Sequence, residues 1–196
     1  MRLLLLRHVE TKANSDKKYI GHSTSEYTAK GQKDIAMILE FLAKEDFDKI
    51  YSSPLPRTVK LAELISKKYD RQLIVDETLK EMNFGIFEGK TYQELEKEYQ
   101  NQWQKWTKDY LHYRIPEGES CMDVYQRVSL FIDNLKSNKE EKLLIITHGG
   151  IIQTFITYLL DLEINDRWHF KISPAGMVDI EYKNDFGVIN RIINDI

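Results

Sequence analysis

Two short, uninterrupted apolar runs constrain the fold of this chain more than any other feature. They are Leu3–Leu6 near the N-terminus and Leu143–Ile146 far along the sequence. Both runs are continuous rather than alternating, which is typical of central strands in a parallel sheet that is covered on both faces. The sequence therefore predicts a sheet whose centre is buried on both sides.

Shorter apolar stretches and helical patterns fill the rest of the chain. Further strands are expected at Lys49–Tyr51 and Leu73–Val75, with a C-terminal hairpin at Met177–Tyr182 and Gly187–Ile193. Apolar residues at helical spacing predict helices over Ala29–Ala43, Pro54–Lys68 and Gly150–Leu160. Thr28 is a suitable N-cap, and capping boxes begin at Thr91 and at Ser120, the latter opening a helix to about Lys136.

This alternation of strands and helices predicts an α/β fold, a three-layer αβα sandwich with a mostly parallel central sheet. The sequence has 196 residues, and we interpret residues 1–196 as a single domain. The segment at about 91–118 differs because it is polar and rich in aromatic residues. We expect it to form helices over one edge of the sheet as a small helical cap. The cap aromatics are expected mainly to pack against one another.

Composition and charge exclude several classes of protein. The net charge is −3 and the pI is about 6.0, which argues against a nucleic-acid binder. Cys121 is the single cysteine, so an internal disulfide and a CxxC metal pair are both excluded. No apolar stretch approaches the roughly 20 residues that cross a bilayer, and the N-terminal run is too short for a signal peptide. We expect a complete, soluble cytoplasmic protein whose oligomeric state stays open; edge strands near the C-terminus could pair in a homodimer.

Polar side chains come directly after four of the predicted strands. Arg7 and His8 come after the first, Arg57 lies just after the second, Glu81 comes after the third, and His148 precedes the Gly150 helix. Because ligands in open α/β sheets bind beyond the carboxyl ends of the strands, we expect these side chains to share one rim. Taken alone, Arg7-His8 is as often a plain strand end as a functional pair, and Arg57, Glu81 and His148 are more often surface or structural residues. The expected presence of all of them at one rim of the sheet is what indicates a site.

The residue types at this rim suit phosphate chemistry. Two guanidinium groups offer forked donors that match phosphate oxygens, and a helix N-terminus adds backbone N–H groups. A neutral imidazole whose other nitrogen is held by a hydrogen bond can attack phosphorus. A carboxyl group can supply the proton that the leaving oxygen needs. The sequence supplies no convincing metal site, and we expect no metal and no cofactor.

Four sequence blocks resemble the histidine phosphatase superfamily, the phosphoglycerate-mutase-like group. The blocks are Arg7-His8-x-Glu10-Thr11 with Asn14, Ser52-Ser53-Pro54-x-x-Arg57, Glu81 with Phe84-Gly85-x-Phe87-Glu88-Gly89, and Thr147-His148-Gly149-Gly150. They occur in the family's order and span residues 7 to 150. The first block alone would be moderately specific, whereas all four in order are a strong resemblance.

The resemblance implies a phosphomonoester hydrolase that acts through a phosphohistidine on His8. Glu81 would protonate the leaving oxygen and later deprotonate the attacking water. Arg7, Arg57 and His148 would hold the phosphoryl oxygens. Asn14, the Gly21 loop and the backbone at Gly149 would make further substrate or phosphate contacts. The implied ligand is a small phosphomonoester, with no nucleic-acid or membrane partner.

One residue departs from the family pattern. The family usually has glycine after the nucleophilic histidine, and this chain has Val9. A β-branched residue at positive φ would be strained. We therefore expect ordinary β-type torsions at Val9 and a side chain that points away from the phosphate.

The resemblance also narrows the substrate. The runs Asn83–Thr91 and Pro116–Ser120 look most like the α-ribazole phosphatases of cobalamin synthesis, which remove a 5′-phosphate from a benzimidazole riboside. Trp103 and Trp106 could stack on such a base. The alternatives are a broad-specificity phosphatase, a small phosphoglycerate mutase, and a catalytically silent module that binds phosphorylated ligands, which only Val9 favours.

Overall fold

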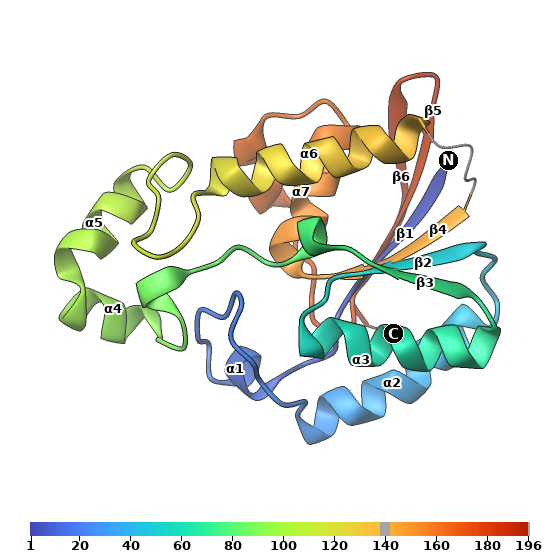
Figure 1. Ribbon diagram of the computed structural model, residues 1–196, viewed down its shortest axis with the longest axis horizontal. Helices are drawn as coiled ribbons and strands as arrows, with labels where there is room; N and C mark the ends of the chain where they lie inside the picture. The colour runs from blue at the N-terminus through green and yellow to red at the C-terminus, as the bar shows by residue number, and fades with distance from the viewer. Residues whose placement is uncertain (138–141, 196) are drawn as a thin grey trace.

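The computed structural model describes residues 1–137 and 142–195 (Figure 1). Within these residues, six strands form one sheet in the order β3-β2-β4-β1-β5-β6. The strands are β1 (Arg2–Arg7), β2 (Lys49–Ser52), β3 (Gln72–Val75), β4 (Lys142–Thr147), β5 (Met177–Lys183) and β6 (Phe186–Ile193). The first four in that order are parallel to one another, β5 is antiparallel to β1, and β5 and β6 form an antiparallel hairpin.

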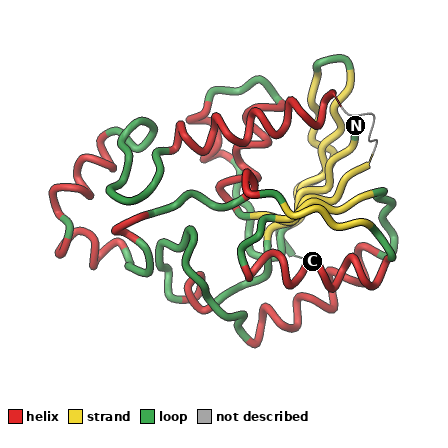
Figure 2. Tube along the Cα trace, viewed as in Figure 1, coloured by secondary structure: helices red, strands yellow, loops and turns green. Residues whose placement is uncertain are grey.

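Helices cover both faces of the sheet, as the strands in yellow and helices in red make clear (Figure 2). The α-helices are α1 (Lys12–Ser15), α2 (Ala29–Leu42), α3 (Pro56–Tyr69), α4 (Tyr92–Glu98), α5 (Gln100–Lys108), α6 (Cys121–Ser137) and α7 (Gly149–Leu159). Single turns of 3-10 helix are η1 (Glu77–Leu79) and η2 (Gly85–Phe87), and a longer one is η3 (Ile164–His169). Helices α2 and α3 lie on one face, and α6 and α7 lie on the other (Figure 1). The three-layer α/β prediction is confirmed.

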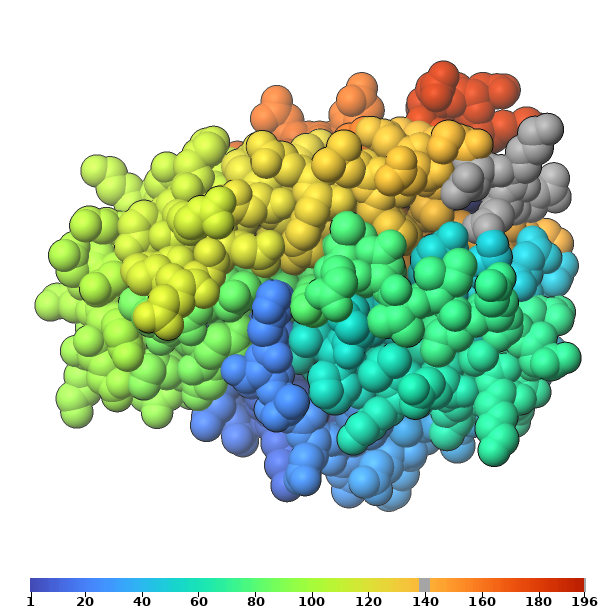
Figure 3. Space-filling view, in the orientation of Figure 1, coloured from blue at the N-terminus to red at the C-terminus, as the bar shows by residue number. Residues whose placement is uncertain are grey.

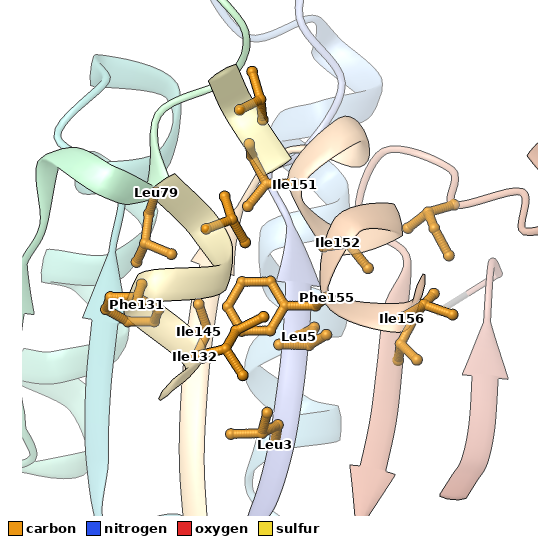
Figure 4. Packing of buried hydrophobic residues seen from close by; sticks show 14 of the residues in the cluster. Leu3, Leu5, Leu79, Phe131, Ile132, Ile145, Ile151, Ile152, Phe155 and Ile156 are labelled. Atoms are coloured by element: carbon orange, nitrogen blue, oxygen red, sulfur yellow. The ribbon is translucent and has the colours of Figure 1, made fainter. Parts of the chain in front are cut away.

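The alternation of side chains along the central strands explains why their sequences are apolar throughout. Leu3 and Leu5 of β1 pack with side chains of α6 and α7, among them Phe155 (Figure 4). Leu4 and Leu6 of the same strand pack on the opposite face, against α2 and α3. Successive residues of a strand point to opposite faces, so a strand covered on both faces must be apolar at every position.

The predicted helix boundaries differ from the structure by one or two residues at the site. Helix α3 begins at Pro56 rather than Pro54. The residue before a proline is held in extended conformation, so Leu55, at φ −64° and ψ 139°, cannot be helical. Helix α7 begins one residue earlier than predicted, at Gly149. The N-cap at Thr28 and the capping box at Thr91 are confirmed, whereas α1 and the 3-10 turns were not predicted.

Residues 91–118 contain α4 and α5, as expected, but these helices lie beyond the sheet at one end of the molecule rather than along one of its edges (Figure 1). Aromatic side chains attach them to the rest of the protein. The ring of Tyr19 lies 5.8 Å from that of Trp103 and 5.6 Å from that of Trp106, and Phe87 lies 6.0 Å from Trp103. In Figure 3 the blue surface of the early chain lies between the yellow-green surface of this segment and the teal surface of α3.

Candidate active site

His8 comes directly after the last residue of β1, and its main chain is fixed on both sides. Its N–H donates to the carbonyl of Thr147 at 3.0 Å, and its carbonyl accepts from the N–H of Ala175 at 3.0 Å. Its ring atom Nδ1 lies 2.7 Å from the carbonyl oxygen of Val9. A carbonyl oxygen can only accept, so Nδ1 carries the proton and Nε2 keeps its lone pair.

The surroundings of His8 keep its ring uncharged. The side chain is 3% exposed, and burial together with the positive charges of Arg57 and Arg7 holds the pKa of His8 well below its ordinary value. A neutral imidazole with a free Nε2 is the form that can attack phosphorus. The fold therefore supplies this form at neutral pH without a carboxylate partner.

Arg57, in the first turn of α3, lies directly against the free nitrogen of His8. Its Nε donates to His8 Nε2 at 3.3 Å, and its two terminal nitrogens donate to the carbonyls of Ser23 at 3.1 Å and Gly21 at 2.6 Å. Burial lowers the pKa of Arg57 to about 10, which leaves the guanidinium charged at neutral pH. The Gly21 loop thus reaches the site through its carbonyl groups, which aim Arg57 at the histidine.

Arg7 ends β1 and lies against the start of α7. One terminal nitrogen donates to the carbonyl of Ile172 at 2.6 Å, and burial lowers the pKa of the guanidinium. A Cβ on Gly149 would lie 3.3 Å from three atoms of that guanidinium. Gly149 therefore lets the charged group approach the N-terminus of the helix.

His148 faces His8 across the site, with ring centroids 5.2 Å apart. It is fully buried, and its Nε2 lies 2.9 Å from the hydroxyl oxygen of Ser53. Burial and the charge of Arg57 hold the pKa of His148 well below its ordinary value, so this ring is neutral as well. The Ser53 hydroxyl can donate to Nε2, which would leave the proton of His148 on Nδ1.

Glu81 reaches the same rim from the loop after η1. Its Oε2 accepts from the N–H of Gly150 at 3.2 Å, and its Oε1 accepts from the N–H of Met82 at 3.0 Å. The carboxyl group is thus placed at the start of α7, where its charge acts on Arg7. All five side chains that the sequence places after the strands therefore lie at one rim of the sheet.

Two buried donor atoms of this rim have no hydrogen-bond partner within residues 1–137 and 142–195. They are Nε of Arg7 and Nδ1 of His148. Buried polar atoms are nearly always hydrogen-bonded, and an unpaired one costs roughly 1–3 kcal/mol. Two such atoms beside a helix N-terminus form a site that an anion would complete.

The remaining predicted contact residues have structural partners as well. Asn14 Oδ1 accepts from the N–H and the hydroxyl of Thr11, at 3.1 and 3.0 Å, which leaves its Nδ2 as the group that could meet a phosphate. A Cβ on Gly21 would lie 1.9 Å from the carbonyl oxygen of Met82, so close packing requires glycine there. Phosphate contacts by Asn14 and Gly21 stay predictions.

Val9 has the backbone torsions and the side-chain direction that were expected for a β-branched residue at this position. Its φ is not positive, and its side chain is fully buried among residues of the core on the α2 and α3 side. Because the side chain points into that core, the valine leaves the His8 pocket unobstructed. Its carbonyl oxygen still holds His8 Nδ1, which a glycine would do in the same way.

Two residues that orient the site were not assigned a role from the sequence. Ser53 holds His148, and Glu88 holds the Gly21 loop by accepting from the N–H groups of Gly21, His22 and Ser23 at 2.9 to 3.3 Å. Both lie inside the blocks that carry the resemblance, which is the only signal that could have singled them out.

Residues 1–137 and 142–195 contain neither a cluster of possible metal ligands nor a membrane-spanning helix. No three His, Cys, Asp or Glu side chains in these ranges are grouped so that they could hold a metal ion. No helix in the same ranges has the length and apolar character needed to span a membrane.

Comparison with known proteins places this geometry in a family. A profile of the histidine phosphatase superfamily, branch 1, matches residues 3–195. The adenosylcobalamin/alpha-ribazole phosphatase of Escherichia coli strain K12 is 31% identical over 197 residues, covering 99% of this chain and 96% of that protein. Phosphoserine phosphatase 1 of Hydrogenobacter thermophilus is 25% identical over 193 residues, covering 98% and 92%. The crystal structure of the alpha-ribazole phosphatase of Shigella flexneri is 30% identical with a TM-score of 0.92, covering 100% and 96%.

Proposed function

The chain belongs to the histidine phosphatase superfamily, branch 1, and we propose that it hydrolyses α-ribazole 5′-phosphate. Its membership and relatives make it a phosphatase with a histidine nucleophile. The substrate assignment has two supports. Relatives named for this activity match nearly the full chain, and a pocket with aromatic walls opens directly beside Glu81.

We assign the nucleophile to Nε2 of His8, the nitrogen that keeps its lone pair. It attacks phosphorus as the bond from phosphorus to the leaving oxygen breaks, which gives a phosphohistidine and an alcohol. Arg57, Arg7 and Nδ1 of His148 donate to the phosphoryl oxygens, where charge is spread in the transition state. The long 3.3 Å bond between Arg57 and His8 is exchanged for a phosphate contact when substrate binds.

Glu81 is the proton donor and acceptor in this assignment. Its protonated carboxyl gives a proton to the leaving oxygen in the first step. In the second step its carboxylate takes a proton from water, which attacks phosphorus and breaks the bond to His8. Its place at the Gly150 N–H lies at the border between the phosphate site and the aromatic pocket, which is where the leaving oxygen must be.

The aromatic pocket is what favours a riboside phosphate. Trp106, Tyr19, Phe84 and Tyr110 line it, whereas Trp103 does not and packs instead against Phe87 and Tyr19. The stacking hypothesis is therefore kept for Trp106 and withdrawn for Trp103. In this proposal residues 91–118 act as a cap of a single domain, and they form one wall of the leaving-group pocket.

A substrate screen tests the assignment. We expect kcat/KM for α-ribazole 5′-phosphate to exceed that for phosphoserine, 3-phosphoglycerate and p-nitrophenyl phosphate by about tenfold or more, because only the riboside fills the pocket. His8→Ala should abolish all of these activities while keeping the thermal unfolding midpoint near that of the wild type. A higher kcat/KM for phosphoserine would overturn the substrate assignment.

Trapping the intermediate separates an enzyme of this mechanism from a silent module or a mutase. Acid-quenched protein should carry a phosphohistidine at His8. Its absence, with phosphate binding unchanged in His8→Ala, would favour a silent binding module. Phosphoryl transfer between 3-phosphoglycerate and its bisphosphate, without net release of phosphate, would instead favour a mutase.

A further inference from the structure

The leaving-group pocket contains a charged side chain that the reaction does not use. The pocket has a volume of about 200 Å³ and lies between the cap and the start of α7. Five aromatic residues line it: Tyr19, Phe84, Trp106, Tyr110 and Trp168. Among the polar residues that line it are Glu81, Gln153 and Arg167.

Arg167 is buried, with 7% of its surface exposed, yet every hydrogen-bond partner it has is neutral. One terminal nitrogen donates to the sulfur of Cys121 at 2.8 Å. The other donates to the carbonyl of Gly150 at 2.9 Å and lies 3.5 Å from Oε1 of Gln153. Burial raises the pKa of the Cys121 thiol, so this partner stays uncharged.

The third donor of Arg167, its Nε, is buried and has no hydrogen-bond partner among the described residues. No salt bridge within 4.0 Å joins Arg167 to an acidic side chain of residues 1–137 or 142–195. A buried guanidinium N–H that has no acceptor lacks a hydrogen bond, and a bound molecule can supply the acceptor. Arg167 lines the same pocket as Glu81 and Gly150, so a leaving group bound there is next to its side chain.

The walls of the pocket decide what kind of acceptor fits. A carboxylate on a group as small as serine could meet Arg167, but it would leave the aromatic walls without a partner. A flat heterocycle contacts those walls with its faces and can present a ring nitrogen with a lone pair at its edge. We propose that this pocket binds a nitrogen heterocycle of the leaving alcohol and that Arg167 Nε donates a hydrogen bond to a ring nitrogen.

This inference rests on the proposed function and adds the atom that is recognised. Benzimidazole riboside 5′-phosphate has one unsubstituted ring nitrogen, and indole riboside 5′-phosphate has a C–H group in the same place with nearly the same shape. A site built to donate to that nitrogen discriminates against the analogue that lacks it. We expect the wild-type kcat/KM to be about tenfold or more higher for the benzimidazole compound.

The substitution Arg167→Lys keeps a positive charge but removes Nε. It should bring the ratio of the two kcat/KM values below about threefold. Arg114→Lys is the matched control, because Arg114 is an exposed arginine that pairs with Asp123 outside the pocket; it should preserve the wild-type ratio. The wild-type comparison stands even if the Arg167 variant fails to fold.

The outcomes separate this inference from the proposed function. If the wild type hydrolyses both ribosides equally, and both far better than p-nitrophenyl phosphate, the function stands and the role of Arg167 is overturned. If neither riboside is better than p-nitrophenyl phosphate, both proposals fail. If phosphoserine is the best substrate and Arg167→Lys lowers its kcat/KM selectively, Arg167 binds a carboxylate and both proposals are replaced.

Discussion

The two histidines of the site are each oriented through one ring nitrogen, which leaves the other nitrogen for phosphate. His8 is held by the carbonyl of Val9 and His148 by the hydroxyl of Ser53. Burial and the arginines keep both rings neutral. The unpartnered donors on Arg7 and His148 cost free energy in the protein without ligand, and in the proposed reaction a phosphoryl group would accept their hydrogen bonds. Preorganised donors of this kind favour the transition state because they need no rearrangement.

At the residue scale, Ser53 should matter through His148. In Ser53→Ala the ring of His148 loses the one hydrogen bond it makes within the described residues, so the orientation that we propose for Nδ1 toward the phosphoryl group is no longer held. We expect kcat to fall by about tenfold, which corresponds to about 1.4 kcal/mol of transition-state stabilisation. Steady-state kinetics with p-nitrophenyl phosphate measure it. Ser52→Ala is the matched control, since the neighbouring hydroxyl bonds only to the carbonyl of Ser53; equal losses in both variants would contradict the role of Ser53.

At the scale of elements, the site depends on how the loops beyond the strands hold one another. Glu88, just after η2, accepts from the N–H groups of the loop at residues 21–23 and from that of Phe84 at 3.1 Å. The carbonyls of Gly21 and Ser23 in that loop in turn hold Arg57. Through this loop Glu88 therefore fixes the guanidinium that donates to His8.

Glu88→Gln should loosen this loop without removing any group of the reaction. A Gln side chain has one acceptor oxygen in place of two and brings an N–H₂ group toward backbone donors. Because we propose that Arg57 contacts the phosphate and not the leaving group, kcat/KM should fall by a similar factor, about tenfold, for riboside and p-nitrophenyl substrates. Glu94→Gln, which removes an exposed carboxylate that caps α4, is the control and should have little effect. A loss confined to the riboside would place the effect of Glu88 in the leaving-group pocket instead.

At the scale of the whole molecule, the features that depend on strand geometry could be predicted from the sequence. The apolar runs that became β1 and β4 locate the buried centre of the sheet. Because parallel strands end at the same rim, the residues after them had to meet there, and Arg7, His8 and His148 do. The resemblance then supplied the expected role of each residue.

The features that the sequence could not predict depend on contacts between loops and on neutral partners. Nothing in the spacing of residues 21 and 88, or of 121 and 167, indicates that each pair is in contact. Arg167 lies in a 3-10 helix without apolar periodicity. Its burial depends on packing against residues 91–118 and α7, which the sequence does not indicate. Helix boundaries also shifted where Pro56 imposed an extended Leu55.

The neutral buried histidines also make a prediction for the stability of the whole molecule. The pKa values of His8 and His148 are lowered well below 6.5 in the folded protein, and they return to their ordinary value of 6.5 on unfolding. Below pH 6.5 the unfolded chain therefore binds more protons than the folded one. The free energy of unfolding should fall as the pH falls through this window, by up to about 1.4 kcal/mol per pH unit for each histidine.

Urea denaturation at a series of pH values between 7.5 and 5 measures this slope. His8→Gln removes one of the two buried rings, so the loss of stability per pH unit should be about half that of the wild type. His112→Gln, which removes an exposed ring, is the control for the loss of a histidine outside the core. A wild-type free energy of unfolding that stays constant from pH 7 to pH 5 would contradict neutral, buried histidines. It would also contradict the proposal that burial keeps His8 neutral for attack on phosphorus.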